Sequence, residues 1–395
     1  MLESIIKSTA SIIEKNIYII LFYLVLIIII LIFRKRFEIE SKFILLYKTK
    51  FGLKLMEKLS KNYGEIIKIV GYSSIGVGFL GMLFMIFVLI QNLISIIIKP
   101  STTSSLTLVL PGTIIPGIGK LNFTFWLITI FVVALAHESA HGIVSLAHKI
   151  RVKSSGIVFF GPIIGAFVEP EEKEISKSKD IVQYSIFAAG PFANIILSII
   201  IMFIISLFLN PLYIKLTTEA GISFTSIQKD FPAEKAGLKE GIIINKINNQ
   251  SIKNYNDFLE FMISVKPNQT LELSSKNQTF VLVTTENPEK PGRGYIGISG
   301  IKEERVPKSN NILFLTTSWF LTLFNFIMVI SAGIGLFNLL PLGIVDGGRM
   351  IKTALESIYK DKNKALNVWK RISWFVLLLL LFNLLIPAFK PIIKI

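Results

Sequence analysis

Long apolar runs separated by charged segments dominate the sequence. They predict six transmembrane helices, at about residues 17–33, 73–98, 123–147, 181–209, 312–340 and 372–389. A helix rises about 1.5 Å per residue, so roughly 17 to 25 apolar residues cross the hydrocarbon core of a bilayer. The pattern therefore predicts a mainly α-helical, polytopic membrane protein.

Composition agrees with this class. Of the 395 residues, 52% are hydrophobic and 17% are charged, which is too apolar for a soluble protein of this length. The absence of cysteine excludes disulfide frameworks, thiol nucleophiles and cysteine-ligated zinc. The net charge of +16 is interpreted as topology and not as nucleic-acid binding, because Lys and Arg accumulate in the cytoplasmic loops of membrane proteins. The expected location is the cell membrane, with several passes.

Basic segments orient the predicted spans. Residues 34–68 carry ten Lys or Arg against four acidic residues, in a spacing typical of a helix, and residues 349–371 carry seven against two. Placing both segments in the cytoplasm puts the loops after the first, third and fifth spans inside. The loop 100–122, whose apolar middle is too short to cross, is expected to dip into the bilayer or to lie on its surface.

The chain divides into four predicted regions. Residues 1–122 form an N-terminal two-span region with a basic cytoplasmic loop. Residues 123–209 hold two spans joined by a membrane-associated β-hairpin at 158–168, whose free edge could accept a substrate strand. Residues 210–308 have the composition of a soluble α/β domain, placed outside the cytoplasm, and residues 309–395 hold the C-terminal spans.

The third span ends in a His-Glu-x-x-His motif at residues 137–141. On a helix, His137 and His141 lie one turn apart on one face and can reach a single zinc ion, with Glu138 beside them as the expected general base. Such a site takes a third protein ligand and keeps its fourth position open for water. The sequence therefore predicts Zn²⁺ as the cofactor.

Acidic residues in the bilayer point to the third ligand. Glu138 and Asp346 are the two acids inside predicted spans or at their membrane-embedded ends. A carboxylate at mid-bilayer costs roughly 2.5 to 3.5 kcal/mol on insertion scales, so such residues are functional candidates. Asp346 follows an apolar helix and is flanked by glycines, whereas Glu169 and Glu171 lie in an acidic loop and remain the alternative ligands. His148 is about 10.5 Å along the helix axis from His141, too far to bind the same ion.

These motifs together resemble a known family. The motif at 137–141, the sequence Asn338-x-x-Pro341-x-x-x-x-Asp346-Gly347 and an inserted soluble domain look like the site-2 protease family of intramembrane zinc metalloproteases, peptidase family M50. The resemblance covers most of residues 123–350. It implies Asp346 as the third zinc ligand and proteolysis of transmembrane helices near the cytoplasmic face.

The resemblance also implies roles for two asparagines. Gly190-Pro191-x-x-Asn194 would line the site, where the amide of Asn194 could stabilise the oxyanion of the tetrahedral intermediate. Asn338 could hold the unwound backbone of the substrate.

The inserted domain resembles a PDZ domain of the prokaryotic type. The resemblance rests on the order of its predicted strands and helices and on the Pro-Ala-x-x-Ala-Gly-Leu-x-x-Gly sequence at residues 232–241. It implies a groove that accepts a chain terminus or strand by β-augmentation. A domain that only restricts access to the site is the alternative.

The predicted function is regulated intramembrane proteolysis, with transmembrane helices of membrane proteins as substrates, the lipid bilayer as environment and a peptide terminus as partner of the PDZ-like domain. Two alternatives stay open. A membrane gluzincin-type peptidase would use Glu169 as third ligand and would keep zinc and activity in Asp346→Ala. A non-catalytic metal-binding membrane protein would be unaffected by Glu138→Gln.

Overall fold

The computed structural model describes residues 2–41, 44–50, 52–98, 106–160, 163–276, 278–288, 290–359 and 361–393. Contacts divide the chain into two compact units. The helical unit comprises Met1–Ile205 and Thr322–Ile395, and the inserted unit comprises Ser206–Leu321.

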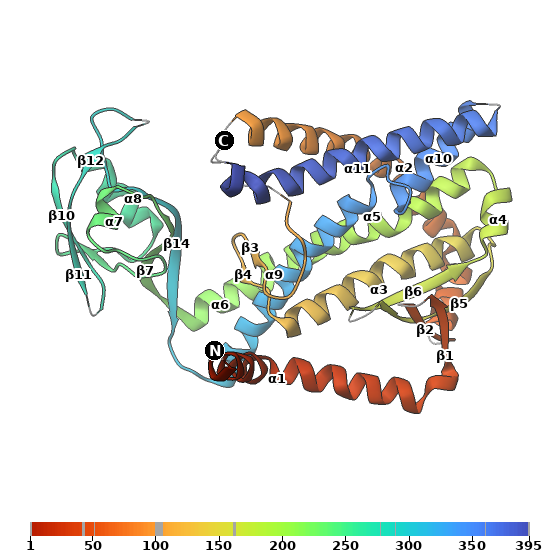
Figure 1. The fold of residues 1–395 in the computed structure, drawn as a ribbon, viewed down its shortest axis with the longest axis horizontal. Coiled ribbons are helices and arrows are strands. Elements are labelled where there is room, and N and C mark those ends of the chain that lie inside the picture. Colours follow the sequence, from red (N-terminus) through yellow and green to blue (C-terminus); the bar gives the residue numbers. More distant parts are fainter. Residues whose placement is uncertain are drawn as a thin grey trace. The chain divides into compact units, whose positions relative to one another are not determined.

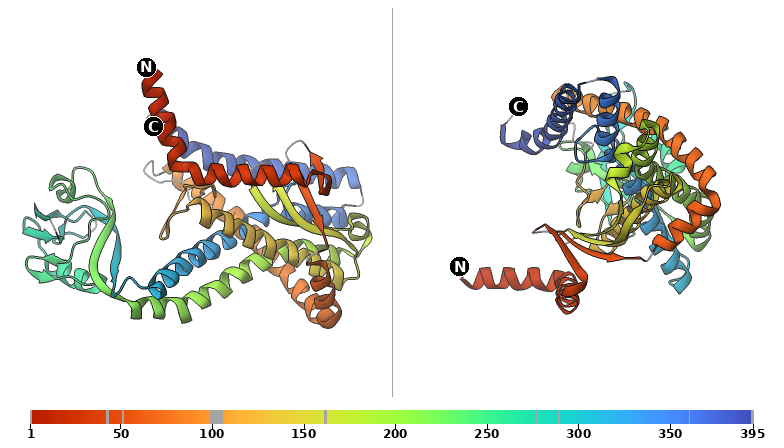
Figure 2. Two further views of the ribbon diagram at one scale, coloured as in Figure 1. Left: turned by 90° about the horizontal axis from the view of Figure 1, so that it is seen from below. Right: turned by 90° about the vertical axis from the view of Figure 1, so that its right-hand side faces the viewer.

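Long helices build the helical unit (Figures 1 and 2). Their bounds are α1 (Leu2–Ile32), α2 (Leu53–Ile98), α3 (Phe123–Ala147), α5 (Asp180–Ile204), α10 (Asp346–Ile358), α11 (Lys362–Ile393) and, from Thr322 onward, α9 (Ile312–Asn338). Three shorter segments, η1 (Arg34–Arg36), α4 (Glu172–Lys177) and the π-helical η2 (Ile205–Leu209), connect or extend them. Helix α3 packs against both α2 and α5, and α10 packs against α5 and α11.

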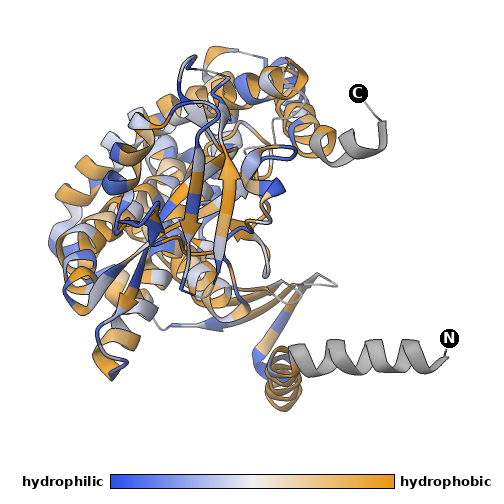
Figure 3. Cartoon of the chain, turned by 90° about the vertical axis from the view of Figure 1, so that its left-hand side faces the viewer, coloured by the Kyte–Doolittle hydropathy of each residue, from blue (hydrophilic) through white to orange (hydrophobic). Residues whose placement is uncertain are grey.

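Five helices in the described part of the chain are long and apolar enough to cross a membrane. They are Leu53–Ile98, Phe123–Ala147, Asp180–Leu216, Ile312–Asn338 and Lys362–Ile386. The first predicted span corresponds to a shorter apolar helix, Ile17–Ile32, so the count of six is not confirmed. Apolar residues predominate along the long helices (Figure 3), many with outward side chains such as Leu80 and Phe203. The protein is a mainly helical, multi-pass membrane protein.

A four-stranded antiparallel sheet packs against α3. Its strands are β1 (Phe37–Ser41), β2 (Ile44–Thr49), β5 (Val152–Phe160) and β6 (Ile163–Pro170), in the order β1-β2-β5-β6. The hairpin predicted at 158–168 is present as β5 and β6, and its Gly161-Pro162 turn lies outside the described residues. Because β6 ends the sheet order and contacts α3, it is an edge strand beside the helix that carries the histidines.

The helical spacing expected over residues 34–68 is wrong for its first part. Phe37–Ser41 and Ile44–Thr49 form β1 and β2, and α2 begins only at Leu53. The hydrogen bonds that make β2 a strand come from β5, more than one hundred residues later in the chain. Where the two strands meet, a Cβ on Gly156 would collide with the Tyr47 carbonyl, so only glycine fits there.

The loop between α2 and α3 forms a small hairpin of β3 (Ile114–Ile115) and β4 (Gly119–Lys120). It is tied to the start of α3, because Trp126 Nε1 donates to the Val109 carbonyl at 3.0 Å. Its predicted relation to the bilayer stays a prediction.

Polar contacts and small residues join the long helices of the helical unit. Asn92 Nδ2 on α2 donates to Asn383 Oδ1 on α11 at 2.7 Å. Gly78 on α2 lies so close to α10 that a Cβ there would meet Met350 Cε at 2.8 Å. Ser331 on α9 donates to the Asn194 carbonyl on α5 at 2.8 Å. Such close contacts fix α2 against α10 and α11, and α5 against α9.

The inserted unit is an α/β fold. It contains α6 (Asn210–Leu216), β7 (Thr217–Ile227), α7 (Pro232–Lys235), β8 (Lys246–Ile247), β9 (Gln250–Ser251), α8 (Tyr255–Ser264), β10 (Thr270–Ser274), β11 (Thr279–Val283), β12 (Thr285–Glu286), β13 (Gly294–Tyr295) and β14 (Ile298–Pro307). The strands pair as β11-β10-β8-β9, β12-β13 and β14-β7 around a core that includes Phe224, Ile247 and Leu271.

The sequence pattern of the inserted unit predicted most of these strands and helices, but not all of them. Residues 242–250, where the sequence indicates a strand followed by a turn, form the short strand β8 and a tight hairpin turn to β9, in which Asn248 and Asn249 adopt φ values of 48° and 64°. Strands β13 and β14 were not predicted. Strand β13 has only two residues, and β14 pairs along almost its whole length with β7, which lies at the other end of the inserted unit's sequence.

Candidate metal centre

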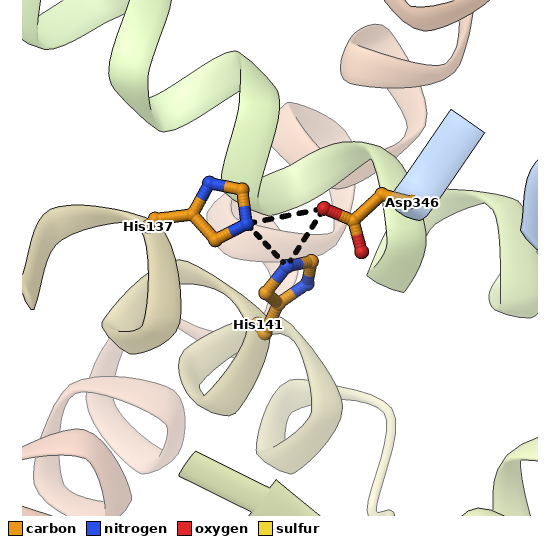
Figure 4. Close-up of side chains that lie close together, drawn as sticks. All are labelled: His137, His141 and Asp346. Atoms are coloured by element: carbon orange, nitrogen blue, oxygen red, sulfur yellow. Dashed lines mark hydrogen bonds and ion pairs between the residues drawn. The ribbon is translucent and has the colours of Figure 1, made fainter. Parts of the chain in front are cut away.

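Three side chains converge on one point between α3 and α10 (Figure 4). His137 and His141 lie one turn apart on α3, and Asp346 is the first residue of α10. Asp346 Oδ2 lies 3.1 Å from His137 Nε2 and 3.4 Å from His141 Nε2, and the two Nε2 atoms are 3.2 Å apart. Ligand atoms around a tetrahedral zinc, about 2.0 to 2.2 Å from the ion, are separated by roughly 3.3 to 3.6 Å. One of the three distances falls in this range and the other two lie about 0.1 to 0.2 Å below it, so the spacing is close to what a zinc ion requires.

Glycines leave the room that such a site needs. Gly190 on α5 faces both histidines, and a Cβ there would collide with His141 Nε2 and come within 2.7 Å of His137 Nε2. Gly347 and Gly348 let α10 start directly against the preceding loop, where Cβ atoms would collide with the carbonyls of Leu339 and Leu342. Two imidazoles and a carboxylate beside a glycine cradle fit a zinc ion.

We expect Gly190→Ala to weaken zinc binding about 10- to 100-fold, because the added methyl displaces the two imidazoles from a shared position. The matched control is Gly333→Ala in α9, where an added Cβ meets nothing within 4 Å. Zinc affinity is measured on the purified full chain by competition with a chelator. Equal affinities in the two variants would contradict the cradle role of Gly190.

Each histidine ring is held through its second nitrogen. His141 Nδ1 lies 2.7 Å from the Ile186 carbonyl, which can only accept, so Nδ1 carries the proton and Nε2 faces the other candidate ligands. His137 Nδ1 lies 3.1 Å from the side-chain amide of Asn194. Metal-binding histidines commonly donate their other N–H in this way. Both rings are thus oriented with Nε2 toward Asp346.

Glu138 borders the same cavity as these three side chains but does not belong to the cluster. Its Oε2 accepts a hydrogen bond from the backbone N–H of Val168 in β6 at 3.1 Å. The cavity has a volume of about 340 Å³, and its lining also includes Asn338, Ile344 and Arg349. A carboxylate fixed next to a metal site in a cavity of this size is suited to proton transfer.

The two predicted asparagines occupy different positions. Asn338, the last residue of α9, lines the cavity, and its amide donates to the Ile334 carbonyl at 3.0 Å. Asn194 is fully buried and does not line the cavity; it contacts His137 on the side of Nδ1, away from Nε2.

The competing candidates lie outside the ligand cluster. Glu169 borders the cavity, but its carboxylate accepts from Ser154 Oγ at 2.7 Å and pairs with Lys48 Nζ at 3.5 Å. The Ser154 hydrogen bond holds the pKa of Glu169 below its ordinary value. His148 Nε2 lies 3.1 Å from Ser185 Oγ, in an environment separate from the cluster.

An ion pair at the cavity was not foreseen from the sequence. Arg349 Nη2 contacts both carboxylate oxygens of Glu172 at 2.6 Å, and its guanidinium lies 4.2 Å from the centre of the Phe187 ring. The sequence indicated Arg349 only as the start of a basic segment. Nothing in the spacing of residues 172 and 349 links them, because the contact depends on how α4 and α10 fold together.

Comparison with known proteins agrees with this geometry. Residues 125–381, which contain both histidines and Asp346, match Peptidase family M50. The chain belongs to peptidase family M50. It is a membrane zinc metalloprotease of the site-2 protease type.

Relatives are found in archaea and bacteria. The chain is 31% identical over 320 residues to an uncharacterized protein of Methanocaldococcus jannaschii, covering 80% of this chain and 79% of the relative. It is 26% identical over 208 residues to a "Putative zinc metalloprotease" of Clostridium acetobutylicum, covering 42% of this chain and 59% of the relative. It is 25% identical over 213 residues to "Probable protease eep" of Enterococcus faecalis, covering 43% and 49%. The two bacterial alignments thus span about half of each relative.

Proposed function

We propose that this M50 metalloprotease hydrolyses peptide bonds within the transmembrane segments of membrane proteins. His137, His141 and Asp346 are the zinc ligands, and Glu138 is the general base. The observation that carries the proposal is the convergence of the three ligand atoms within 3.1 to 3.4 Å. The two histidines and the adjacent Glu138 lie on α3, a helix long and apolar enough to cross a membrane.

The chemistry follows from these positions. Zinc, when bound, supplies a Lewis acid that polarises a peptide carbonyl and activates water. Glu138 takes the proton from the attacking water and passes it to the leaving amine. The Val168 N–H orients the Glu138 carboxylate for this role through one oxygen.

The β6 edge is the proposed binding site for unwound substrate. A peptide bond in a transmembrane helix is covered by its neighbours, so the segment must unwind and find new hydrogen-bond partners before it can be cut. The Val168 N–H points away from β5, because it donates to Glu138. By the two-residue period of a strand, Ala166 and Ile164 direct their backbone groups to the same side. A substrate strand added there runs past Glu138, and Asn338 is placed to hold its backbone from α9.

The charge distribution supports a site near the cytoplasmic face. Lys149, Arg151 and Lys153 follow the histidine-bearing end of α3, and Arg349 and Lys352 lie on α10 just after Asp346. Basic residues accumulate on the cytoplasmic side of membrane proteins. If this end of α3 is cytoplasmic, the apolar helix Asp180–Leu216 runs back across the bilayer and the inserted unit is extracytoplasmic.

The inserted unit is proposed to be PDZ-like and to bind a chain terminus. A cavity of about 250 Å³ lies between α8 and residues 293–301, with an apolar floor that includes Phe258 and Ile296. Lys290 and Arg293 line the same cavity and provide positive charge that suits a terminal carboxylate. Binding of such a terminus could regulate which substrates reach the membrane site.

The test is cleavage of a single-span substrate by the full chain in liposomes, with the cut mapped by mass spectrometry. We expect zinc-dependent cuts inside the apolar segment of the substrate, toward its cytoplasmic end. Cuts confined to the flanking tails would contradict intramembrane proteolysis and favour a tail-clipping peptidase. In the same assay, a peptide with a free C-terminus, but not its amidated form, is expected to alter the rate; no effect of either would leave the inserted unit as a steric barrier.

A further inference from the structure

Asn194 makes a contact that its proposed relation to the oxyanion does not explain. Its side chain is fully buried, and its Nδ2 lies 3.1 Å from His137 Nδ1. Its Oδ1 is also buried and has no hydrogen-bond partner among the described residues. If His137 binds zinc through Nε2, its Nδ1 carries a proton, so two donors face each other while an acceptor beside them is unpaired. Burying opposed donors and an unpaired acceptor in this way lowers the free energy of unfolding.

A half-turn of the amide removes the opposed donors at His137 Nδ1 and leaves Nδ2 at the unpaired position that Oδ1 held. The oxygen and nitrogen of an asparagine amide are nearly alike in shape, and their assignment follows from the hydrogen bonds that each can make. With the amide turned, Oδ1 takes the place of Nδ2 and accepts the N–H of His137. The same His137 position is then held by a hydrogen bond instead of two opposed donors.

The backbone around Asn194 is fixed well enough to make this contact specific. Ser331 on α9 donates to the Asn194 carbonyl at 2.8 Å. Gly335, one turn further along α9, lies so close that a Cβ there would meet Asn194 Cβ at 3.1 Å and the Pro191 carbonyl at 2.9 Å. Helix α9 therefore packs closely against α5 around Asn194, and from this position the Asn194 side chain contacts the ring of His137.

We propose that Asn194 is a positioning residue whose Oδ1 accepts the N–H of His137 Nδ1 and so keeps Nε2 of that ring directed to zinc. The Ile186 carbonyl does the same for His141. Nδ1 and Nε2 lie on opposite sides of an imidazole, so Asn194 stands behind the ligand and not at the open position of the site. This assignment replaces the oxyanion role that the family resemblance implied, and it rests on the proposal that His137 is a ligand.

Two near-isosteric variants test the contact through zinc affinity, measured on the purified full chain by chelator competition. Asn194→Leu keeps the volume and removes the acceptor, and is expected to weaken zinc binding about 10- to 100-fold. Asn194→Asp keeps an acceptor at the same place, and is expected to bind zinc at least as tightly as the wild type. Wild-type affinity in Asn194→Leu, or an equal loss in both variants, would overturn the proposal.

Two controls distinguish a wrong role for Asn194 from a wrong assignment of His137 as a zinc ligand. Asn383→Leu makes the same exchange at a buried asparagine that holds α11 to α2 through Asn92 and the Leu89 carbonyl, and is expected to keep wild-type zinc affinity. A purely structural role for Asn194 would make both leucine variants behave alike. His137→Ala must lose zinc; if it does not, the ligand assignment itself fails, whatever Asn194 does. If Asn194→Leu does not fold, the affinity of Asn194→Asp decides alone, and a tenfold loss there contradicts the proposal.

Discussion

Glu138→Gln is expected to lower the rate of peptide cleavage about 10²- to 10⁴-fold, the usual contribution of a general base, and to leave zinc binding unchanged. Glutamine has the same shape as glutamate, and its Oε1 can still accept the Val168 N–H that fixes the side chain at 3.1 Å. It cannot take a proton from water at neutral pH. Initial rates of cleavage in liposomes and the zinc content of the same samples check both halves of the expectation.

Glu169→Gln is the matched control for this variant. It makes the same exchange at a carboxylate that borders the same cavity but is engaged by Ser154 and Lys48. We expect it to cleave within a few-fold of the wild type, because the Glu169 carboxylate is held by Ser154 and Lys48 and does not take part in the reaction. Equal cleavage by Glu138→Gln and wild type would instead contradict the general-base role of Glu138. Zinc bound to both proteins without cleavage by either would support a protein whose site only binds metal.

The metal site could be predicted from the sequence because its strongest signals are local. Two histidines four residues apart meet on any helix, and the glutamate between them needs no tertiary information. Asp346 required a different argument, the cost of a carboxylate in lipid, which reduces the candidates to very few. The structure brings these residues within hydrogen-bonding distance of one another.

The parts that the sequence did not reveal depend on partners that are distant along the chain. Strand β2 exists because β5 supplies its hydrogen bonds, and β14 exists because of β7. The predicted span at about 73–98 covers only the apolar part of α2, since hydropathy measures affinity for lipid and not helix formation. The charged first turns, with Lys54, Lys58 and Lys61, continue the same helix beyond its apolar part.

The N-terminal strands have a consequence for the site. Strands β1 and β2 cover the β5 side of the hairpin, so β6 is the edge that faces the helix with the histidines. Lys48 on β2 reaches across the sheet to Glu169 on β6, which ties the first fifty residues to the strand proposed to bind substrate. Strands β1 and β2 are thus part of the structure that presents this edge, although the sequence indicated no function for them.

Asp346→Ala is expected to reduce zinc affinity by more than the 10- to 100-fold that loss of an outer contact costs, because it removes a ligand outright. The change leaves two neutral imidazoles, 3.2 Å apart, as the remaining protein donors. Activity should fall with the zinc content and should not return fully at saturating zinc, since the ligand that completes the tetrahedron is missing. Metal analysis and cleavage in liposomes are measured on the same preparations.

Glu169→Ala is the decisive counterpart to Asp346→Ala. A gluzincin-type site would lose zinc in Glu169→Ala and keep it in Asp346→Ala, whereas the arrangement in this structure predicts the reverse. The reason is geometric: Asp346 Oδ2 lies 3.1 Å and 3.4 Å from the two Nε2 atoms, while the Glu169 carboxylate is turned to Ser154 and Lys48. Asp346→Asn refines the comparison, because it keeps the shape and one oxygen but removes the charge that balances the ion. An intermediate affinity for that variant would show that charge, and not only position, makes Asp346 a ligand.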